Sequence, residues 1–387
     1  MQVKLSNLRR AVAVSISALL VSLGSYALAQ NATGAIKGIV KDQHDAVVAE
    51  ATITVTNKAT GATRKVKAGS EGNFVFENMV PGEYEVRVES DGFSTQVQML
   101  SVAVGNTSTL NFAMTVGAVS QTVEVTGDAP VLNTTDTVVG GVINRERVEN
   151  LPLNGRSFLS IALLEPGVSV NYNANSGAGN PNNYFQVSVG SAPQQMTLIS
   201  IDGSRVNDRI TGGTSQNFSA ETVQEFQIST LGFDLSAGTV SAGAVNVVSR
   251  TGTNTLHGGG FFFFRDHNMA AFPGFKRPTE KNAAGVPLNL LCLDPKSAGC
   301  GRVLDPFFVR RQYGGSLGGP IKKDKIFFFG NYERNNQVGA NSITFSDATL
   351  FHFNHVAAQP QHGDLVNARV DYTINHKHTA FLRAGVD

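Results

Sequence analysis

The sequence from Val223 to Asn268 reads VQEFQISTLGFDLSAGTVSAGAVNVVSRTGTNTLHGGGFFFFRDHN. The stretch is rich in small residues and glycines, and four phenylalanines, Phe261 to Phe264, stand near its end. A Gly-rich segment that passes into an aromatic strand is typical of the junction between a soluble domain and a membrane β-barrel. We therefore expect the chain to change from a soluble domain to membrane strands within this stretch.

Alternating residues predict membrane strands towards the C-terminus. Between Leu365 and Asn375, apolar residues alternate with polar ones, and the segment from Thr379 to Asp387 repeats the pattern. A two-sided pattern over about 10 residues suits a strand with lipid on one face and water on the other. Earlier candidate strands span residues 260–266, 308–319 and 326–334, which gives about five strands. The run Phe261 to Phe264 breaks the alternation, and an interfacial aromatic girdle explains it better than a strand in mid-bilayer.

The connections between these strands alternate in length. Met269 to Pro306 and Asn335 to His362 are long, whereas Pro320 to Lys325 and Asn375 to His378 are short. Membrane barrels combine long outer loops with short periplasmic turns in this way. Five strands cannot close a barrel, and an open edge in lipid leaves backbone groups unpaired. We therefore expect the chain to be the N-terminal part of a longer protein.

Two cysteines, Cys292 and Cys300, fall in the first predicted outer loop. In an exported protein, such a pair in a Pro- and Gly-containing loop predicts a disulfide. A structural zinc site would need more ligands nearby. We expect the disulfide and no metal site.

The first 29 residues have the pattern of a signal peptide. Lys4, Arg9 and Arg10 precede the apolar run from Ala11 to Leu23, and Ala27-Leu28-Ala29 provides small residues for cleavage after Ala29. The apolar run is shorter than the roughly 20 residues that a membrane-spanning helix needs. No later apolar run approaches that length, so a membrane role of the mature chain requires β-strands.

Composition narrows the function classes. The chain has 387 residues, a net charge of +1, 40 glycines, no tryptophan and 41% hydrophobic residues. These values suggest a β-rich chain of two or three domains and give no charge signature for nucleic-acid binding. No arrangement of residues resembles an active site or a cofactor site. We expect no enzyme activity, no catalytic residue and no cofactor.

Residues 30–117 predict a β-sandwich. Residues 52–56 and 84–88 alternate with a period of two, and turn signals separate these and other short strands. Phe74, Phe76, Tyr84 and Phe93 allow two interpretations, a sugar-stacking platform or core packing. We favour the core, because Phe74 and Phe76 lie on the same face of one strand.

Two segments of this sandwich resemble a known family. GNFVFENMVPGEY at 72–84 and Asp91-Gly92-Phe93 are similar to the carboxypeptidase regulatory-like domain. The resemblance implies a seven-stranded fold that carbohydrate-binding modules share. The sandwich has no residues in an arrangement that would carry peptidase activity.

Residues 118–249 predict an α+β domain. The segment from Val142 to Asn150 suggests a short polar helix that ends before Pro152. Asp202 follows a short strand and precedes Gly203. We favour a turn-capping role for Asp202 over a metal ligand, because no second carboxylate stands at calcium-loop spacing.

Three motifs together resemble one family. They are the opening stretch, LPLNGRSF at 151–158 and GGSLGGPI at 314–321, and they are similar to TonB-dependent outer-membrane receptors of the Oar-like type. The resemblance implies a plug domain within 118–249 and a barrel that begins within 250–387 and has about 22 strands in complete members. Arg156, within the first motif, has two interpretations: an ion pair with a carboxylate on the barrel wall or a solvated loop charge.

The segment from Gln121 to Gly127 has the position of a TonB box. Such a segment engages an energy-transducing partner by adding a strand to a sheet edge. The candidate residues are Thr122, Val123, Glu124, Val125 and Thr126. The alternative is that they form the last strand of the preceding sandwich.

The resemblance implies a function in uptake. The expected protein is an outer-membrane transporter for a large or scarce cargo, such as an oligosaccharide, a peptide or a metal chelate. Its expected partners are a TonB-type protein in the periplasm, outer-membrane lipid and the cargo, and not nucleic acid. The alternative is a surface adhesion or carbohydrate-binding protein that the barrel anchors in the outer membrane.

Overall fold

The computed structural model describes residues 33–117, 122–125, 139–151, 153–172, 185–208, 210, 212–231, 241–269, 308–343, 355–375 and 378–387. The predicted signal peptide, Thr126, Cys292 and Cys300 lie outside these residues. Within them, no helix is both long and apolar enough to span a membrane.

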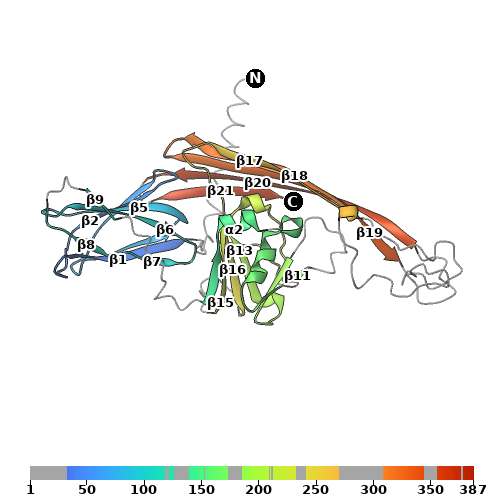
Figure 1. The fold of residues 1–387 in the computed structure, drawn as a ribbon, viewed down its shortest axis with the longest axis horizontal. Helices are drawn as coiled ribbons and strands as arrows, with labels where there is room; N and C mark the ends of the chain where they lie inside the picture. The colour runs from blue at the N-terminus through green and yellow to red at the C-terminus, as the bar shows by residue number, and fades with distance from the viewer. Residues whose placement is uncertain are drawn as a thin grey trace, which may run out of the picture.

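The described residues are mainly β and form three bodies (Figure 1). A β-sandwich of N-terminal residues lies at the left of the view. The domain of residues 139–249, here called the plug after the resemblance, lies beside it, and a long sheet, here called the barrel sheet and formed by residues 257–386, extends above the plug. The predicted fold class is confirmed.

Two sheets form the sandwich. One pairs β1 (Gly34–Asp42) with β4 (Asn73–Met79), β7 (Thr107–Thr109) and β8 (Phe112–Met114). The other has the order β3 (Thr63–Lys67), β2 (Thr52–Asn57), β5 (Gly82–Glu89), β6 (Thr95–Val102) and β9 (Thr122–Val125). Because β7 and β8 follow each other along β1, both in parallel, they act as one interrupted strand. With them counted as one, residues 34–114 form seven strands, and β9 is added at an edge.

The sandwich aromatics belong to its core. Phe74, Phe76 and Tyr84 are each at most 5% exposed, and Phe93 packs against the same cluster. The rings of Phe74 and Phe112 have centroids 6.2 Å apart. Alternation places these side chains between the two sheets, where burial of apolar area stabilises the fold. The core interpretation is confirmed.

The plug is built around a five-stranded sheet with the order β10 (Val139–Ile143), β15 (Val223–Leu231), β16 (Gly243–Ser249), β13 (Thr197–Ile201) and β14 (Ser204–Arg205). A hairpin of β11 (Val168–Tyr172) and β12 (Phe185–Val189) accompanies it. Short 3-10 helices connect these strands: η2 (Asn154–Arg156), η3 (Phe158–Leu164), η5 (Gln194–Met196) and η6 (Ala220–Thr222).

The predicted polar helix is α2 (Arg145–Asn150), and it begins later than expected. Val142 belongs to β10, and the side chain of Asn144 caps the helix by accepting a hydrogen bond from the Arg147 amide at 3.1 Å. The plug core lies between the sheet and the helices α2 and η3. There the rings of Phe158 and Phe226 meet edge to face, 5.7 Å apart.

The barrel sheet has the sequential antiparallel order β17 (His257–Asp266), β18 (Val309–Lys322), β19 (Ile326–Ile343), β20 (His355–Thr373) and β21 (Thr379–Val386). The short helix η8 (His267–Met269) follows β17. All five predicted strands are confirmed. The predicted long loop from Asn335 to His362 is wrong in extent, because β19 and β20 remain paired as far as Ile343 and His355. Pro360 is tolerated there because β21 pairs with β20 only from Val366 onward.

The two faces of the barrel sheet differ as predicted. Val366, Val370 and Tyr372 are 39–43% exposed on one face, whereas Asn367 and Arg369 are buried on the other face. This second face covers the plug. The aromatic run divides between the faces. The rings of Phe261 and Phe263 lie near Arg156 of the plug. Because side chains alternate, only Phe262 and Phe264 point outward, so the girdle interpretation applies only to these two.

Candidate functional site

The motif at 151–158 places Arg156 at the surface of the plug. Gly155 and Arg156, at the end of η2, have φ values of 76° and 57°, which turn the chain sharply before η3. A positive φ is unfavourable for arginine, so the surrounding structure must hold it. Phe158, buried in the plug core, anchors the far side of this turn. The arginine is thereby directed at the barrel sheet.

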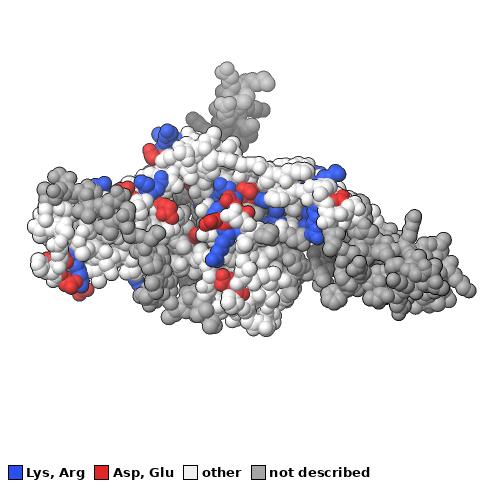
Figure 2. Space-filling view, viewed as in Figure 1, with Lys and Arg blue, Asp and Glu red and all other residues white. Residues whose placement is uncertain are grey.

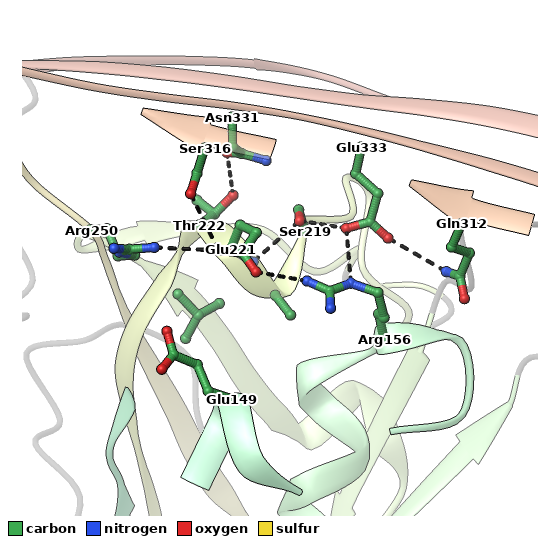
Figure 3. Close-up of polar contacts among 12 residues, drawn as sticks. Glu149, Arg156, Ser219, Glu221, Thr222, Arg250, Gln312, Ser316, Asn331 and Glu333 are labelled. Carbon is green, nitrogen blue, oxygen red and sulfur yellow. Dashed lines mark hydrogen bonds and ion pairs between the residues drawn. The ribbon is translucent and has the colours of Figure 1, made fainter. Parts of the chain in front are cut away.

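Arg156 contacts both domains (Figure 3). Its Nη2 lies 2.9 Å from Oε1 of Glu221 on η6, and its Nε lies 3.4 Å from Oε2 of Glu333 on β19. Its guanidinium also stacks on the ring of Phe261 on β17, 3.8 Å from the centroid. Of the two interpretations of Arg156, the ion pair with the barrel wall is therefore correct.

The carboxylate of Glu221 lies at the centre of three arginines. Besides Arg156, its carboxylate lies 3.0 Å from Nη2 of Arg145 and 3.3 Å from Nη1 of Arg250. Burial raises the pKa of Glu221, but the three positive charges outweigh burial and hold the pKa below its usual value. The glutamate is therefore ionised, and it fixes the helix α2, the turn at Arg156 and the hinge at Arg250 together.

Neutral side chains complete this contact between plug and barrel. Ser219 Oγ donates to Oε2 of Glu333 at 2.5 Å, and Thr222 Oγ1 donates to Oδ1 of Asn331 at 2.9 Å. From the barrel side, Ser316 Oγ donates to Glu221 at 3.3 Å. We call this set, with Arg156, Glu221 and Glu333, the upper seam (Figure 3).

A second cluster joins Asp202 to the barrel. Asp202 accepts hydrogen bonds from the amide and hydroxyl of Ser249 at 2.9 and 2.7 Å, and it forms ion pairs with Arg369 and Arg383 at 3.0 and 2.9 Å. Its side chain is 5% exposed. The preference for a turn-capping role is wrong, because the carboxylate binds strands β16, β20 and β21 and not its own turn. We call this set the Asp202 cluster.

Both clusters lie where the plug meets the inner face of the barrel sheet. Figure 2 shows acidic and basic residues gathered between the plug and this sheet, near the centre of the view. A buried ion pair adds little net stability, because desolvation offsets its attraction, but removal of one partner leaves a costly unpaired charge. Water can replace each of these polar contacts, so the arrangement allows separation of the two surfaces without exposing an apolar core.

The sandwich also contacts the other two bodies. The amide of Val104, in the turn after β6, donates to Oε1 of Glu225 on β15 at 2.5 Å. Burial raises the pKa of Glu225 to about 7, partly opposed by this bond. On the barrel side, the amide of Asn254 donates to the carbonyl of Ala59 at 2.9 Å, and its side chain donates to Asp324 at 2.7 Å.

The candidate TonB box lies on the sandwich in this structure. Thr122–Val125 form β9, which pairs in parallel with β6 from Thr95 to Gln98. The segment is therefore paired in the way that the alternative interpretation predicts. A strand of four residues at a sheet edge has few hydrogen bonds to lose when another strand competes for it.

Sequence reasoning missed most partners in the two clusters. Glu221, Arg369 and Arg383 carried no motif, although Arg369 and Arg383 each alternate with apolar residues in one of two predicted strands. A charge on the water-facing side of such a strand is the signal that marks a contact with the plug. Among the described residues, no group of three or more His, Cys, Asp or Glu could hold a metal ion.

Two family models match the chain. The model of the carboxypeptidase regulatory-like domain matches residues 35–115, which form the sandwich. The model of the outer membrane beta barrel domain matches residues 248–351, from the end of the plug to the connection after β19. Both domains agree with the motifs that predicted them.

One curated relative is similar to most of the chain. The TonB-dependent transporter Oar of Myxococcus xanthus is 25% identical over 318 residues, or 80% of this chain. The chain spans only 27% of the length of that relative.

Two solved structures are also similar. The match to the siderophore receptor PirA from Acinetobacter baumannii covers 64% of this chain and 31% of the receptor chain. The sequence identity is 19% and the TM-score is 0.38. The match to the outer membrane transporter YddB from Escherichia coli covers 61% of this chain and 31% of the transporter chain. The sequence identity is 11% and the TM-score is 0.43. The chain thus joins a carboxypeptidase regulatory-like domain to residues of an outer membrane beta barrel domain, and it is similar over most of its length to a TonB-dependent transporter.

Proposed function

We propose that the protein is a TonB-dependent receptor of the outer membrane, which takes up a cargo that is too large or too scarce for passive pores. The observation that carries the proposal is the upper seam. There Arg156 of a folded domain contacts Glu333 on the polar inner face of the barrel sheet. A domain attached to that face would fill the inside of a closed barrel.

The proposed mechanism has three steps. Outer loops bind the cargo, a periplasmic partner engages Thr122 to Thr126, and the pull on this segment separates the plug from the barrel wall. The contacts at the upper seam suit the last step, since they are ion pairs and hydrogen bonds that water can replace. Partner binding by strand addition suits the β-strand conformation of Thr122–Val125.

The proposal is tested by locking the plug to the barrel. In the doubly substituted Thr222→Cys and Asn331→Cys protein, a short, reducible methanethiosulfonate linker would join two positions whose side chains are hydrogen-bonded at 2.9 Å. The readout is the set of medium components that wild-type cells deplete and cells without the gene do not.

We expect the linked protein to deplete none of these components and to recover after reduction. The single variants, treated with the same linker, serve as controls and should behave like the wild type. Undiminished depletion by the linked protein would contradict the proposal.

A further inference from the structure

The sandwich lies beside the plug (Figure 1), and one of its ends contacts both the plug and the connection that leads into the barrel sheet. At the plug, the turn after β6 places the amide of Val104 on the carboxyl group of Glu225, and both residues are buried. A Cβ on the next residue, Gly105, would overlap with the side-chain amide of Gln227 on the same plug strand. The turn therefore fits against β15 without space for a side chain at Gly105.

A second turn of the sandwich, residues 57–62 between β2 and β3, lies on the connection between β16 and β17. Asn254 of this connection donates its backbone amide to the carbonyl of Ala59 at 2.9 Å and its side-chain amide to Asp324 at 2.7 Å. Asp324 belongs to the turn between β18 and β19, and its amide donates to Oδ1 of Asn254 at 2.9 Å. A Cβ on Gly61 would overlap with the Asp324 carboxylate. The sandwich is thus fixed to the connection and to the barrel sheet at one point.

Both turns leave the same end of one sandwich sheet. Val102 at the end of β6 pairs with Gly82 of β5. Asn57 at the end of β2 pairs with Tyr84 of the same strand, β5. The strand β9, which contains four of the five candidate residues for the periplasmic partner, is the edge strand of this sheet. A pull on β9 would therefore act on the sheet that carries both contacts.

We propose that the sandwich is a clasp, which bridges the plug and the barrel sheet and must undock before the two can separate. If the plug moves and the sandwich stays, the contact between Val104 and Glu225 is broken. If the sandwich moves with the plug, the contact between Ala59 and Asn254 is broken. One set of contacts is lost in either case, so the sandwich opposes separation together with the upper seam and the Asp202 cluster. This inference rests on the proposed function, because it gives the sandwich a role in plug movement.

The test uses three glycines of the sandwich that have similar backbone conformations. Gly61, Gly92 and Gly105 have φ values of 70°, 81° and 68°. Leucine at any of them therefore carries a similar backbone cost. Gly61→Leu and Gly105→Leu each also place a side chain into a docking contact. Gly92→Leu is the matched control, because a Cβ there would meet no atom of the described residues within 4 Å.

Each substitution is made in a Thr222→Cys protein and studied after purification from its membrane. Thr222 is 2% exposed and lies in the upper seam, so a thiol reagent reaches position 222 only when the plug and the barrel sheet separate. The labelling rate at this position, located by peptide mapping, measures separation. Hydrogen exchange of the Val104 and Asn254 amides, corrected for intrinsic rates, measures undocking in the same samples.

We expect Gly61→Leu and Gly105→Leu to accelerate labelling at position 222 and exchange of the amide at the altered contact about tenfold or more, which is the size of a typical overpacking effect. Gly92→Leu should change neither rate. Three results would overturn the clasp: undocking without faster labelling, equally fast labelling in Gly92→Leu, and amides that stay protected in both docking variants.

The labelling assay needs neither an energy source nor a partner. A failed clasp would leave uptake dependent on residues 121–127, whereas failed uptake would leave the labelling rates unchanged. Failure of the clasp and failure of the transport proposal are therefore distinguishable.

Discussion

Nε of Arg156 in the plug lies 3.4 Å from Oε2 of Glu333 in the barrel sheet, although the two residues are 177 positions apart in the sequence. Glu333 is only 3% exposed, and Ser219 and Gln312 supply its other hydrogen bonds. One arginine therefore neutralises a buried charge of the barrel and, through Glu221, connects that charge to the plug. The stability of the plug within the barrel depends on this connection.

Arg156→Gln should destabilise the plug strongly. The substitution leaves Glu333 buried without its positive partner, which costs about 3–5 kcal/mol in comparable buried pairs. Loss of the stacking contact with Phe261 adds to this cost. The measurement is the free energy of unfolding of the plug, from denaturant-dependent hydrogen exchange of its strands.

Arg147→Gln provides the control for this prediction, because Arg147 is exposed on the neighbouring helix α2. Its effect should be within about 0.5 kcal/mol. The double variant Arg156→Gln with Glu333→Gln should recover part of the loss, since neither charge then remains unpaired. Equal effects of Arg156→Gln and Arg147→Gln would show that the ion pair does not stabilise the plug.

The contact between the sandwich and the plug should depend on pH through Glu225. Burial raises the pKa of this carboxyl from its usual 4.5 to about 7 in the docked state. Because the docked state holds the proton more tightly, docking is strongest below about pH 4.5 and weakens as the pH rises to about 7. The docking equilibrium should change by up to tenfold per pH unit in this window. Hydrogen exchange of the Val104 amide, corrected for intrinsic rates, measures it.

Glu225→Gln isolates the titration from the hydrogen bond. The glutamine can still accept from the Val104 amide, but it does not ionise between pH 4.5 and 7. Protection of this amide should then be independent of pH after correction. A variant that keeps the pH dependence of the wild type would assign the titration to another group.

Truncation of two neighbouring residues of the sandwich should destabilise it by very different amounts. Phe74 is 4% exposed, whereas Val75 on the other face of β4 is 50% exposed. Phe74→Ala should cost about 3–5 kcal/mol of unfolding free energy, and Val75→Ala about 0.5 kcal/mol or less. Urea unfolding followed by hydrogen exchange of the sandwich strands gives both values. If Phe74→Ala instead reduced sugar binding at unchanged stability, the sugar-stacking interpretation would be restored.

A disulfide between β6 and β9 should prevent uptake. Val97 and Glu124 are paired positions of the two strands, so cysteines there would fix β9 on the sandwich. If the periplasmic partner must take up this strand, depletion of the medium should stop in the oxidised protein and return after reduction. Cysteines at Thr54 and Arg87, paired positions of β2 and β5, provide the control. Normal uptake by the oxidised protein would mean that the partner binds elsewhere or leaves β9 in place.

Alternation predicts most of the fold from the sequence. The segment 365–375 has one apolar and one polar face, which is the direct consequence of lipid on one side and the plug on the other. The ends of β19 and β20 escaped prediction, because Gly339 and Pro360 lie within them, and these residue types usually mark turns and loops. Both residues are nevertheless paired with the neighbouring strand.

The contacts between the domains could be predicted only in part. The family motif marked Arg156 and left open whether it pairs with the barrel wall or is solvated, since a motif fixes a position but not what lies opposite. The pairing of Asp202 with Arg369 depends on how the plug is placed against β20, and no local rule encodes that placement. The same limit applies to β9, because four alternating residues suit the edge of the sandwich sheet and the edge of a partner's sheet equally well.

Deletion of 121–127 tests the central claim most directly. The medium components that wild-type cells deplete should remain when this segment is absent, whereas the amount of the same compounds bound at the cell surface should be unchanged. This result would separate energised uptake from the alternative of adhesion. Continued depletion by the deletion variant, at the wild-type rate and with normal amounts of protein in the outer membrane, would contradict transport driven through this segment.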